Sequence, residues 1–141
     1  MLEITFDDSL ITGNETIDAQ HRELIDRIKQ FVDSCQSGDG KVKAIRMLDY
    51  LAEYTDFHFK AEEQLQADVN YPGLTEHHAK HEEFKKNLDA LYAFLEEAEG
   101  PTDAFVEQVK ANVVDWLFTH IKAFDRSVAE FIYMRDNPNR L

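Results

Sequence analysis

Apolar residues recur at every third or fourth position along four stretches of the chain. This spacing places them along one face of an α-helix. Four such helices with short connections predict an all-α fold, an up-down-up-down four-helix bundle. We expect one domain over residues 1–141, with the bundle at about 18–135. The predicted helices span about 18–36, 41–68 and 74–98, and the fourth begins near Thr102 and Asp103.

Turn-forming and capping residues mark the ends of these helices. Asp18 is a good N-cap for the first helix, and Ser37-Gly38-Asp39-Gly40 ends it. Tyr71-Pro72-Gly73 separates the second helix from the third, and Glu99-Gly100-Pro101 separates the third from the fourth. Residues 1–17 contain apolar side chains without a helical period, so we expect an extended arm that packs over the bundle.

Residue types that bind metals interrupt the apolar faces, in register with leucines. His58 and Glu62 are four residues apart on the second helix and therefore share a face, and two histidines on the third helix repeat that spacing. On the fourth helix His120 and Asp125 are five residues apart, which is about 140° around an ideal helix. We expect a break, a tightened turn or a bulge near residues 120–124 to bring both side chains to one site. The whole candidate set is His21, His58, Glu62, His77, His81, His120 and Asp125.

Metal ions explain why such a set is buried. Each unpaired polar group in an apolar core costs on the order of several kcal/mol, whereas neutral imidazoles and carboxylates are good metal ligands. A structural zinc site needs only about four ligands, and calcium and magnesium prefer oxygen ligands, so neither type of site uses this set. Nitrogen and oxygen ligands in this number fit two metals bridged by carboxylates in a bundle core. With a bridging oxide or hydroxide, two six-coordinate irons keep one open position for a small ligand.

The balance of ligands favours reversible binding over oxidation chemistry. Di-iron oxidases of this architecture use mostly glutamates, with Glu-x-x-His motifs on two helices. That motif is absent from the predicted inward faces. A histidine-rich and nearly saturated pair of metals suits the binding and release of a small molecule, so we do not expect an enzyme.

Composition and charge narrow the possible partners. The chain has 141 residues and a net charge of -13 at pH 7, which argues against binding nucleic acid or an anionic membrane surface. It contains no apolar run of the roughly 20 residues that cross a bilayer, and its N-terminal segment lacks the plan of a signal peptide. A single cysteine, Cys35, excludes an internal disulfide and fits the cytoplasm, where we expect the protein. We expect Cys35 to pack at a helix end rather than to act as a nucleophile.

Four segments closely resemble the hemerythrin family, in particular its single-domain bacterial members. They are IDAQH in the first predicted helix, HFKAEE in the second, HAKH in the third and WLFTHIKAFD in the fourth. The resemblance implies two iron ions that bind O2 reversibly, for storage, transport or delivery. The ligands it implies are His77, His81 and His120 on one iron, His21 and His58 on the other, and Glu62 and Asp125 as bridges.

The resemblance extends to the surroundings of the O2 site. Leu117 matches a residue that lines the family's oxygen pocket, and Trp116 is a second candidate for the pocket wall. Gln66 stands where methionine is common. It either faces the site, where it can admit water or donate a hydrogen bond to a bound ligand, or points outward. Phe6 stands where many bacterial relatives have a tryptophan, which indicates a change of packing.

The sequence leaves other functions as alternatives. An oxygen or redox sensor needs an output domain, for which the predicted bundle leaves no room. A di-iron enzyme that handles peroxide or nitric oxide needs a general acid or base outside the ligand set, and none is evident. A structural bundle stapled by metal needs no open position. Iron and manganese are not distinguished by the ligand types, and we expect Glu63 and His78 to be solvated.

Overall fold

The computed structural model of the protein describes residues 4–38 and 40–138. The first three residues of the predicted arm, Asp39 in the turn after the first helix and residues 139–141 lie outside the described residues. The elements in chain order are the 3-10 helix η1 (Asp8–Leu10), α1 (Glu15–Gln36), α2 (Lys41–Asp68), α3 (Leu74–Glu97), α4 (Asp103–Val109), the π-helical segment η2 (Lys110–Asp115), α5 (Trp116–His120), the π-helical segment η3 (Ile121–Asp125) and α6 (Arg126–Asp136).

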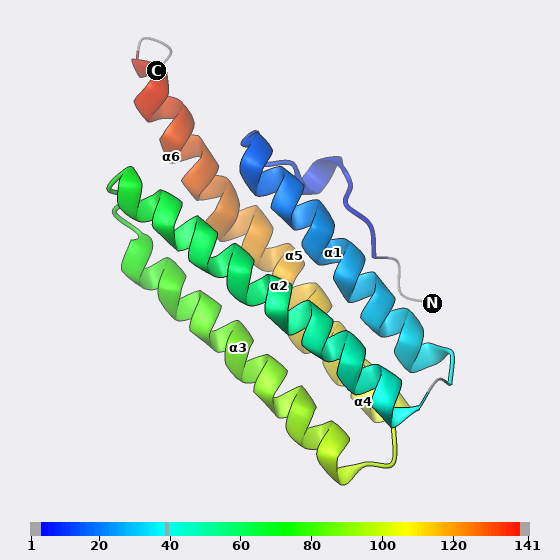
Figure 1. The fold of residues 1–141 in the computed structure, drawn as a ribbon. Helices are drawn as coiled ribbons and strands as arrows, with labels where there is room; N and C mark the ends of the chain where they lie inside the picture. Colours follow the sequence, from blue (N-terminus) through cyan, green and yellow to red (C-terminus); the bar gives the residue numbers. More distant parts are fainter. Residues whose placement is uncertain (1–3, 39, 139–141) are drawn as a thin grey trace.

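The helices form the predicted four-helix bundle (Figure 1). α1, α2 and α3 are three of its rods, and the elements from α4 to α6 join end to end into the fourth rod. α1 packs on α2, α2 packs on α3, and both α1 and α3 contact α4. The four rods therefore close around a common interior, and the predicted all-α fold is confirmed.

Two clusters of buried apolar side chains fill this interior. The larger contains four almost fully buried phenylalanines and most of the inward-facing leucines. The smaller consists of Ile17, Val128 and Ala129, with Leu65, Tyr71 and Ile132 packed against it. The apolar residues follow one face of each helix, and the outer faces are mainly polar, although Val42 and Phe57 are exposed on α2. Within residues 4–38 and 40–138, no helix is long and apolar enough to cross a membrane.

The first helix starts at Glu15 rather than near residue 18, because its N-cap is Asn14 and not Asp18. The side chain of Asn14 accepts a hydrogen bond from a backbone N–H in the first turn. Asp18 is buried inside α1, where Oδ1 accepts from the backbone N–H and the hydroxyl of Thr12 and Oδ2 accepts from the N–H of Gly13. The predicted arm is therefore shorter than expected, and Asp18 ties its end to the bundle.

The two π-helical segments change the direction in which side chains of the fourth rod point. A π turn closes with i→i+5 hydrogen bonds instead of i→i+4, so residues five apart come close to one face. η3 covers the interval between His120 and Asp125, and both side chains are buried. The predicted bulge near residues 120–124 is confirmed, whereas η2 was not predicted.

Two inward positions differ from the predicted pattern. On α2 the pattern places Leu65 inward, but Gln66 is fully buried and Leu65 only partly so. Gln66 follows Glu62 by one turn and therefore points to the same interior. On the fourth rod the apolar spacing runs from Val109 and Val113 to Trp116, yet Leu117 is fully buried and Trp116 is partly exposed. η2 lies immediately before Trp116 and shifts the helical phase there.

Cys35 is a packing residue, as predicted. It is buried near the end of α1 and belongs to the larger apolar cluster. Burial raises the pKa of the Cys35 thiol to about 11, so the reactive thiolate is scarce at neutral pH.

Asp18→Ala should lower the free energy of unfolding by about 1–2 kcal/mol, because the donors of Thr12 and Gly13 lose their acceptor. Urea unfolding followed by circular dichroism measures this change. Asp33→Ala, at an exposed position of the same helix, is the control and should stay within about 0.5 kcal/mol of the parent protein. Equal losses in the two variants would contradict the anchoring role of Asp18.

Candidate metal centre

All seven sequence-predicted candidates meet in the interior, at one level of the bundle. None of them is more than 3% exposed. Paired candidates on one rod are four residues apart or, across η3, five residues apart, so the helical period delivers them to one place. α1 supplies His21, α2 supplies His58 and Glu62, α3 supplies His77 and His81, and the fourth rod supplies His120 and Asp125.

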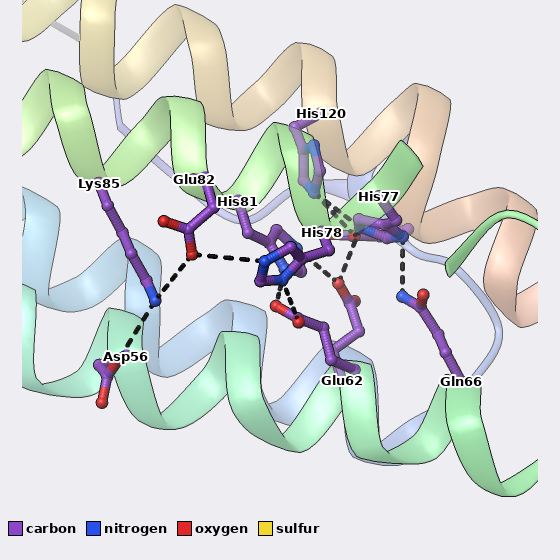
Figure 2. Close-up of polar contacts among 11 residues, drawn as sticks. Asp56, Glu62, Gln66, His77, His78, His81, Glu82, Lys85 and His120 are labelled. Carbon is purple, nitrogen blue, oxygen red and sulfur yellow. Dashed lines mark hydrogen bonds and ion pairs between the residues drawn. The ribbon is translucent and has the colours of Figure 1, made fainter. Parts of the chain in front are cut away.

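Three histidines lie on one side of the two carboxylates and form, with them, the three-histidine group. His77 Nε2 lies 3.0 Å from Glu62 Oε1 and 2.9 Å from Asp125 Oδ1. His81 Nε2 lies 3.1 Å from Glu62 Oε1, and His120 Nε2 lies 3.1 Å from Asp125 Oδ1. Figure 2 shows His77, His81 and His120 converging above Glu62. One possible ligand atom from each of the five residues lies within 4.8 Å of the others.

The other two histidines lie near the same carboxylates and complete the two-histidine group. His21 Nε2 lies 2.8 Å from Asp125 Oδ2. The rings of His21 and His58 meet edge to face, with centroids 4.9 Å apart. Ligand atoms of His21, His58, Glu62 and Asp125 again lie within 4.8 Å of one another. The two groups therefore share both carboxylates, and this cluster is able to hold metal.

Many atoms of this cluster have no hydrogen-bond partner within the described part of the chain. They include the Nε2 atoms of His21, His58 and His81 and both carboxylate oxygens of Glu62 and Asp125. The close nitrogen–oxygen distances bring these atoms together without the directions that hydrogen bonds require. An unsatisfied buried polar atom costs about 1–3 kcal/mol, and a charged one costs more. Imidazole nitrogens and carboxylate oxygens together suit a transition metal, so the residues present fit an iron centre.

Burial keeps two of the histidines neutral. Burial, followed by the charge of His21, lowers the pKa of His58 to about 3. Burial, followed by the charge of His77, lowers the pKa of His81 to about 2. Both imidazoles are therefore uncharged at neutral pH and keep a lone pair that a metal can use.

The pKa values of the two carboxylates shift in opposite directions. Burial, followed by the negative charge of Asp125, raises the pKa of Glu62 well above its usual range. Burial opposes ionisation of Asp125 too, but the charge of His120 and the close approach of the imidazole nitrogens of His120, His21 and His77 hold its pKa well below the usual range. Burial likewise lowers the pKa of His77, yet the close carboxylates of Asp125 and Glu62 outweigh it and raise the pKa to about 9. Without metal the cluster holds protons that a cation would replace.

Outer hydrogen bonds orient two of the imidazoles. His58 Nδ1 donates to Gln20 Oε1 at 2.7 Å. His81 Nδ1 donates to Glu63 Oε2 at 2.8 Å. With the proton fixed on Nδ1, each ring turns the lone pair of Nε2 toward the cluster, as metal-binding histidines require.

Gln66 faces the site, the first of its two predicted orientations. It is fully buried, and its amide nitrogen lies 2.8 Å from His77 Nδ1 (Figure 2). Its amide oxygen has no hydrogen-bond partner among the described residues. A metal on His77 Nε2 would require a proton on Nδ1, and a half-turn of the amide would present this oxygen as the acceptor.

Gln20 and Glu63 were not predicted to take part in the site. Glu63 was expected to be solvated, but it is only partly exposed, and its two oxygens accept from His81 and His78. His78 is exposed, as predicted. A signal was present in the sequence, because Gln20 and Glu63 directly precede or follow a candidate ligand. Such neighbours lie beside the site, where they can reach a histidine on the adjacent helix.

Aromatic rings enclose the three-histidine group. His81 stacks on Phe59, with centroids 3.8 Å apart and planes 4° apart. His120 lies between Trp116, at 4.6 Å and 13°, and Phe124, at 5.2 Å and 11°. These rings hold the imidazoles in position and cover them with apolar surface.

Two surface hollows approach the cluster from different sides. One, of about 350 Å³, is lined in part by Trp116, His120 and Phe124. The other, of about 380 Å³, lies between α1 and α2 and is lined in part by Gln20 and Glu62. The second hollow is therefore bounded by the hydrogen-bond partner of His58 and by a carboxylate that both groups share.

Comparison with known proteins identifies the relatives of this chain. The profile of the family described as Hemerythrin HHE cation binding domain matches residues 12–132. A bacteriohemerythrin of Stenotrophomonas maltophilia is 27% identical over 130 residues, which cover 92% of this chain and 82% of the relative. A myohemerythrin of Riftia pachyptila is 32% identical over 120 residues, 85% of this chain and 86% of the relative. A bacteriohemerythrin of Aquifex aeolicus is 27% identical over 118 residues, 84% of this chain and 88% of the relative.

Anaerobic addition of ferrous iron should raise the melting temperature of the metal-free protein, because metal binds the folded chain and occupies the unpaired buried atoms. At a free metal concentration of about 100 times Kd the gain is about 2.7 kcal/mol. Calorimetry measures the shift, and elemental analysis measures the bound iron. Asp125→Asn should lose most of both effects, whereas Asp115→Asn, at an exposed position of the same rod, should retain them. A full gain in Asp125→Asn would argue against metal binding at this cluster.

Proposed function

The chain belongs to the hemerythrin family of cation-binding domains, and from that premise we propose that it binds O2 reversibly at a pair of iron ions. The observation that supports this most strongly is the sharing of Glu62 and Asp125 by two groups of histidines. Two metals held by one common pair of carboxylates form a dinuclear centre. The proposed role is the storage, transport or delivery of O2 in the cytoplasm.

The two groups of donor atoms suggest how the ligands divide. The three-histidine group would bind one iron and the two-histidine group the other, with Glu62 and Asp125 bridging them. We include a bridging oxide or hydroxide, which leaves one position open on the iron with fewer histidines. The iron pair, when bound, supplies the reversible redox chemistry that O2 binding needs. The proposed ligands are His77, His81 and His120, then His21 and His58, and the bridging Glu62 and Asp125.

The rest of the chain supports binding by shaping the surroundings of the centre. Neutral His58 and His81 add no charge, so the carboxylates offset the charge of the metals. Apolar rings and the fully buried Leu117 keep bulk water away, which protects a bound ligand from loss. The hollow between α1 and α2, which is lined in part by Gln20 and Glu62, is the entrance that we propose for O2.

The polar side chains around the cluster favour binding over turnover. Gln20, Glu63 and Gln66 each make a hydrogen bond to a candidate ligand. A side chain committed in this way holds a ligand in place and is poorly placed to transfer protons to a substrate. The binding function is therefore preferred to an enzymatic one.

Reduced, iron-loaded protein should develop a visible charge-transfer band when exposed to O2 and should lose it on purging with argon. The band should return over repeated cycles, with one O2 taken up per pair of irons. Conversion to an oxidised spectrum without such a band, or continuous O2 consumption in an electrode, would favour a redox sensor or an enzyme instead.

Leu117→Phe should weaken O2 uptake at least several-fold while leaving the iron content unchanged, because it adds volume at the proposed pocket. Overpacking of this kind also costs about 1–3 kcal/mol of stability. Leu95→Phe is the matched control: Leu95 is fully buried as well, but lies about 21 Å along α3 from His81. It should lose similar stability and keep normal O2 uptake. Equal O2 uptake in both variants would contradict the assignment of Leu117 to the pocket.

A further inference from the structure

His81 differs from the other candidate ligands in the group that its outer nitrogen meets. Its Nδ1 donates to the carboxylate of Glu63 at 2.8 Å. His58 and His77 meet amide groups at the same position. The remaining two histidines have no hydrogen-bond partner at Nδ1 within residues 4–38 and 40–138. Among the described residues, Glu63 is therefore the one carboxylate in contact with an outer ligand nitrogen.

Glu63 is itself held from the outside. Its second oxygen, Oε1, accepts a hydrogen bond from His78 Nδ1 at 2.5 Å. His78 Nε2 lies 3.7 Å from Glu82 Oε1, which lies 3.4 Å from Lys85 Nζ. Figure 2 shows this row from Lys85 through Glu82 to His78, beside His81. Both oxygens of Glu63 therefore accept hydrogen bonds, and the bond from His78 helps to hold the carboxylate in its position against His81.

We propose that Glu63 is a positioning residue that strengthens His81 as an iron ligand and so stabilises the ferric form of the iron in the three-histidine group. A carboxylate draws the Nδ1 proton toward itself and raises the electron density on Nε2. A more electron-rich ligand favours the metal ion of higher charge. The amides of Gln20 and Gln66 orient their histidines but carry no negative charge to produce this effect. The inference rests on the proposed function and identifies a residue that sets the redox balance of the same centre.

Two substitutions separate the charge of Glu63 from its role as an acceptor. Glu63→Gln keeps an oxygen that can accept from His81 but removes the charge, so it should retain both irons. Its midpoint potential should move to a more positive value in mediated spectroelectrochemistry, where each ferric ion takes up one electron and becomes ferrous. Glu63→Ala removes the acceptor as well and should bind iron roughly 10- to 100-fold more weakly in competition with a chelator.

Glu76→Gln is the control for a general change of charge. Glu76 is exposed and adjacent to the candidate ligand His77, and its replacement removes one negative charge near the centre. A positive shift in Glu63→Gln that Glu76→Gln does not reproduce supports the proposal. Equal potentials in the two variants, or parental iron affinity in Glu63→Ala, would overturn it. If the parent protein itself fails to take up two irons, the proposed function fails first, which is a different result.

Discussion

Seven polar side chains at the centre of an apolar bundle impose a requirement that the rest of the structure must meet. The unpaired nitrogens and oxygens of this layer are buried as deeply as the phenylalanines beside them. Water cannot satisfy them there, and within the described residues few hydrogen bonds do. A cation that accepts several lone pairs at once removes this difficulty. In the proposed function the metal would therefore be a part of the folded core, and the stability of the bundle would depend on it.

The helical period of the sequence was enough to predict the bundle and the seven candidates, because inward positions are a property of spacing. Asp18 shows where local rules stop. It has a residue type that favours an N-cap, but Asn14 caps the helix instead. The carboxylate of Asp18 accepts hydrogen bonds from three donors of Thr12 and Gly13 in the arm. Glu63 and Gln20 show a second limit. Which side chain reaches the outer nitrogen of a histidine depends on the distance between two helices, and one helix's period contains no information about that distance.

The fourth rod shows how a local irregularity reconciles metal geometry with packing. His120 and Val128 are eight residues apart and would be about 80° out of phase on an ideal helix. Accommodating one extra residue in η3 brings them within about 20° of a common direction. Both side chains are buried, so the rod supplies two residues to the site and still packs its last turns inward. π segments are frequent at functional sites for this kind of reason.

The position of the polar layer between the two apolar clusters has a consequence for cooperativity. The smaller cluster, around Ile17, Val128 and Ala129, has few residues of its own and is separate from the larger one. With metal bound, ligands on all four rods are linked to one another, and both ends of the bundle form a single cooperative unit. Without metal, the end of the bundle that holds the smaller cluster is joined to the rest mainly through the layer of candidate ligands. The unpaired polar atoms of that layer make few favourable contacts with one another. We therefore expect the unfolding of the metal-free chain to depart from all-or-none behaviour, since the end with the smaller cluster can open while the rest stays folded.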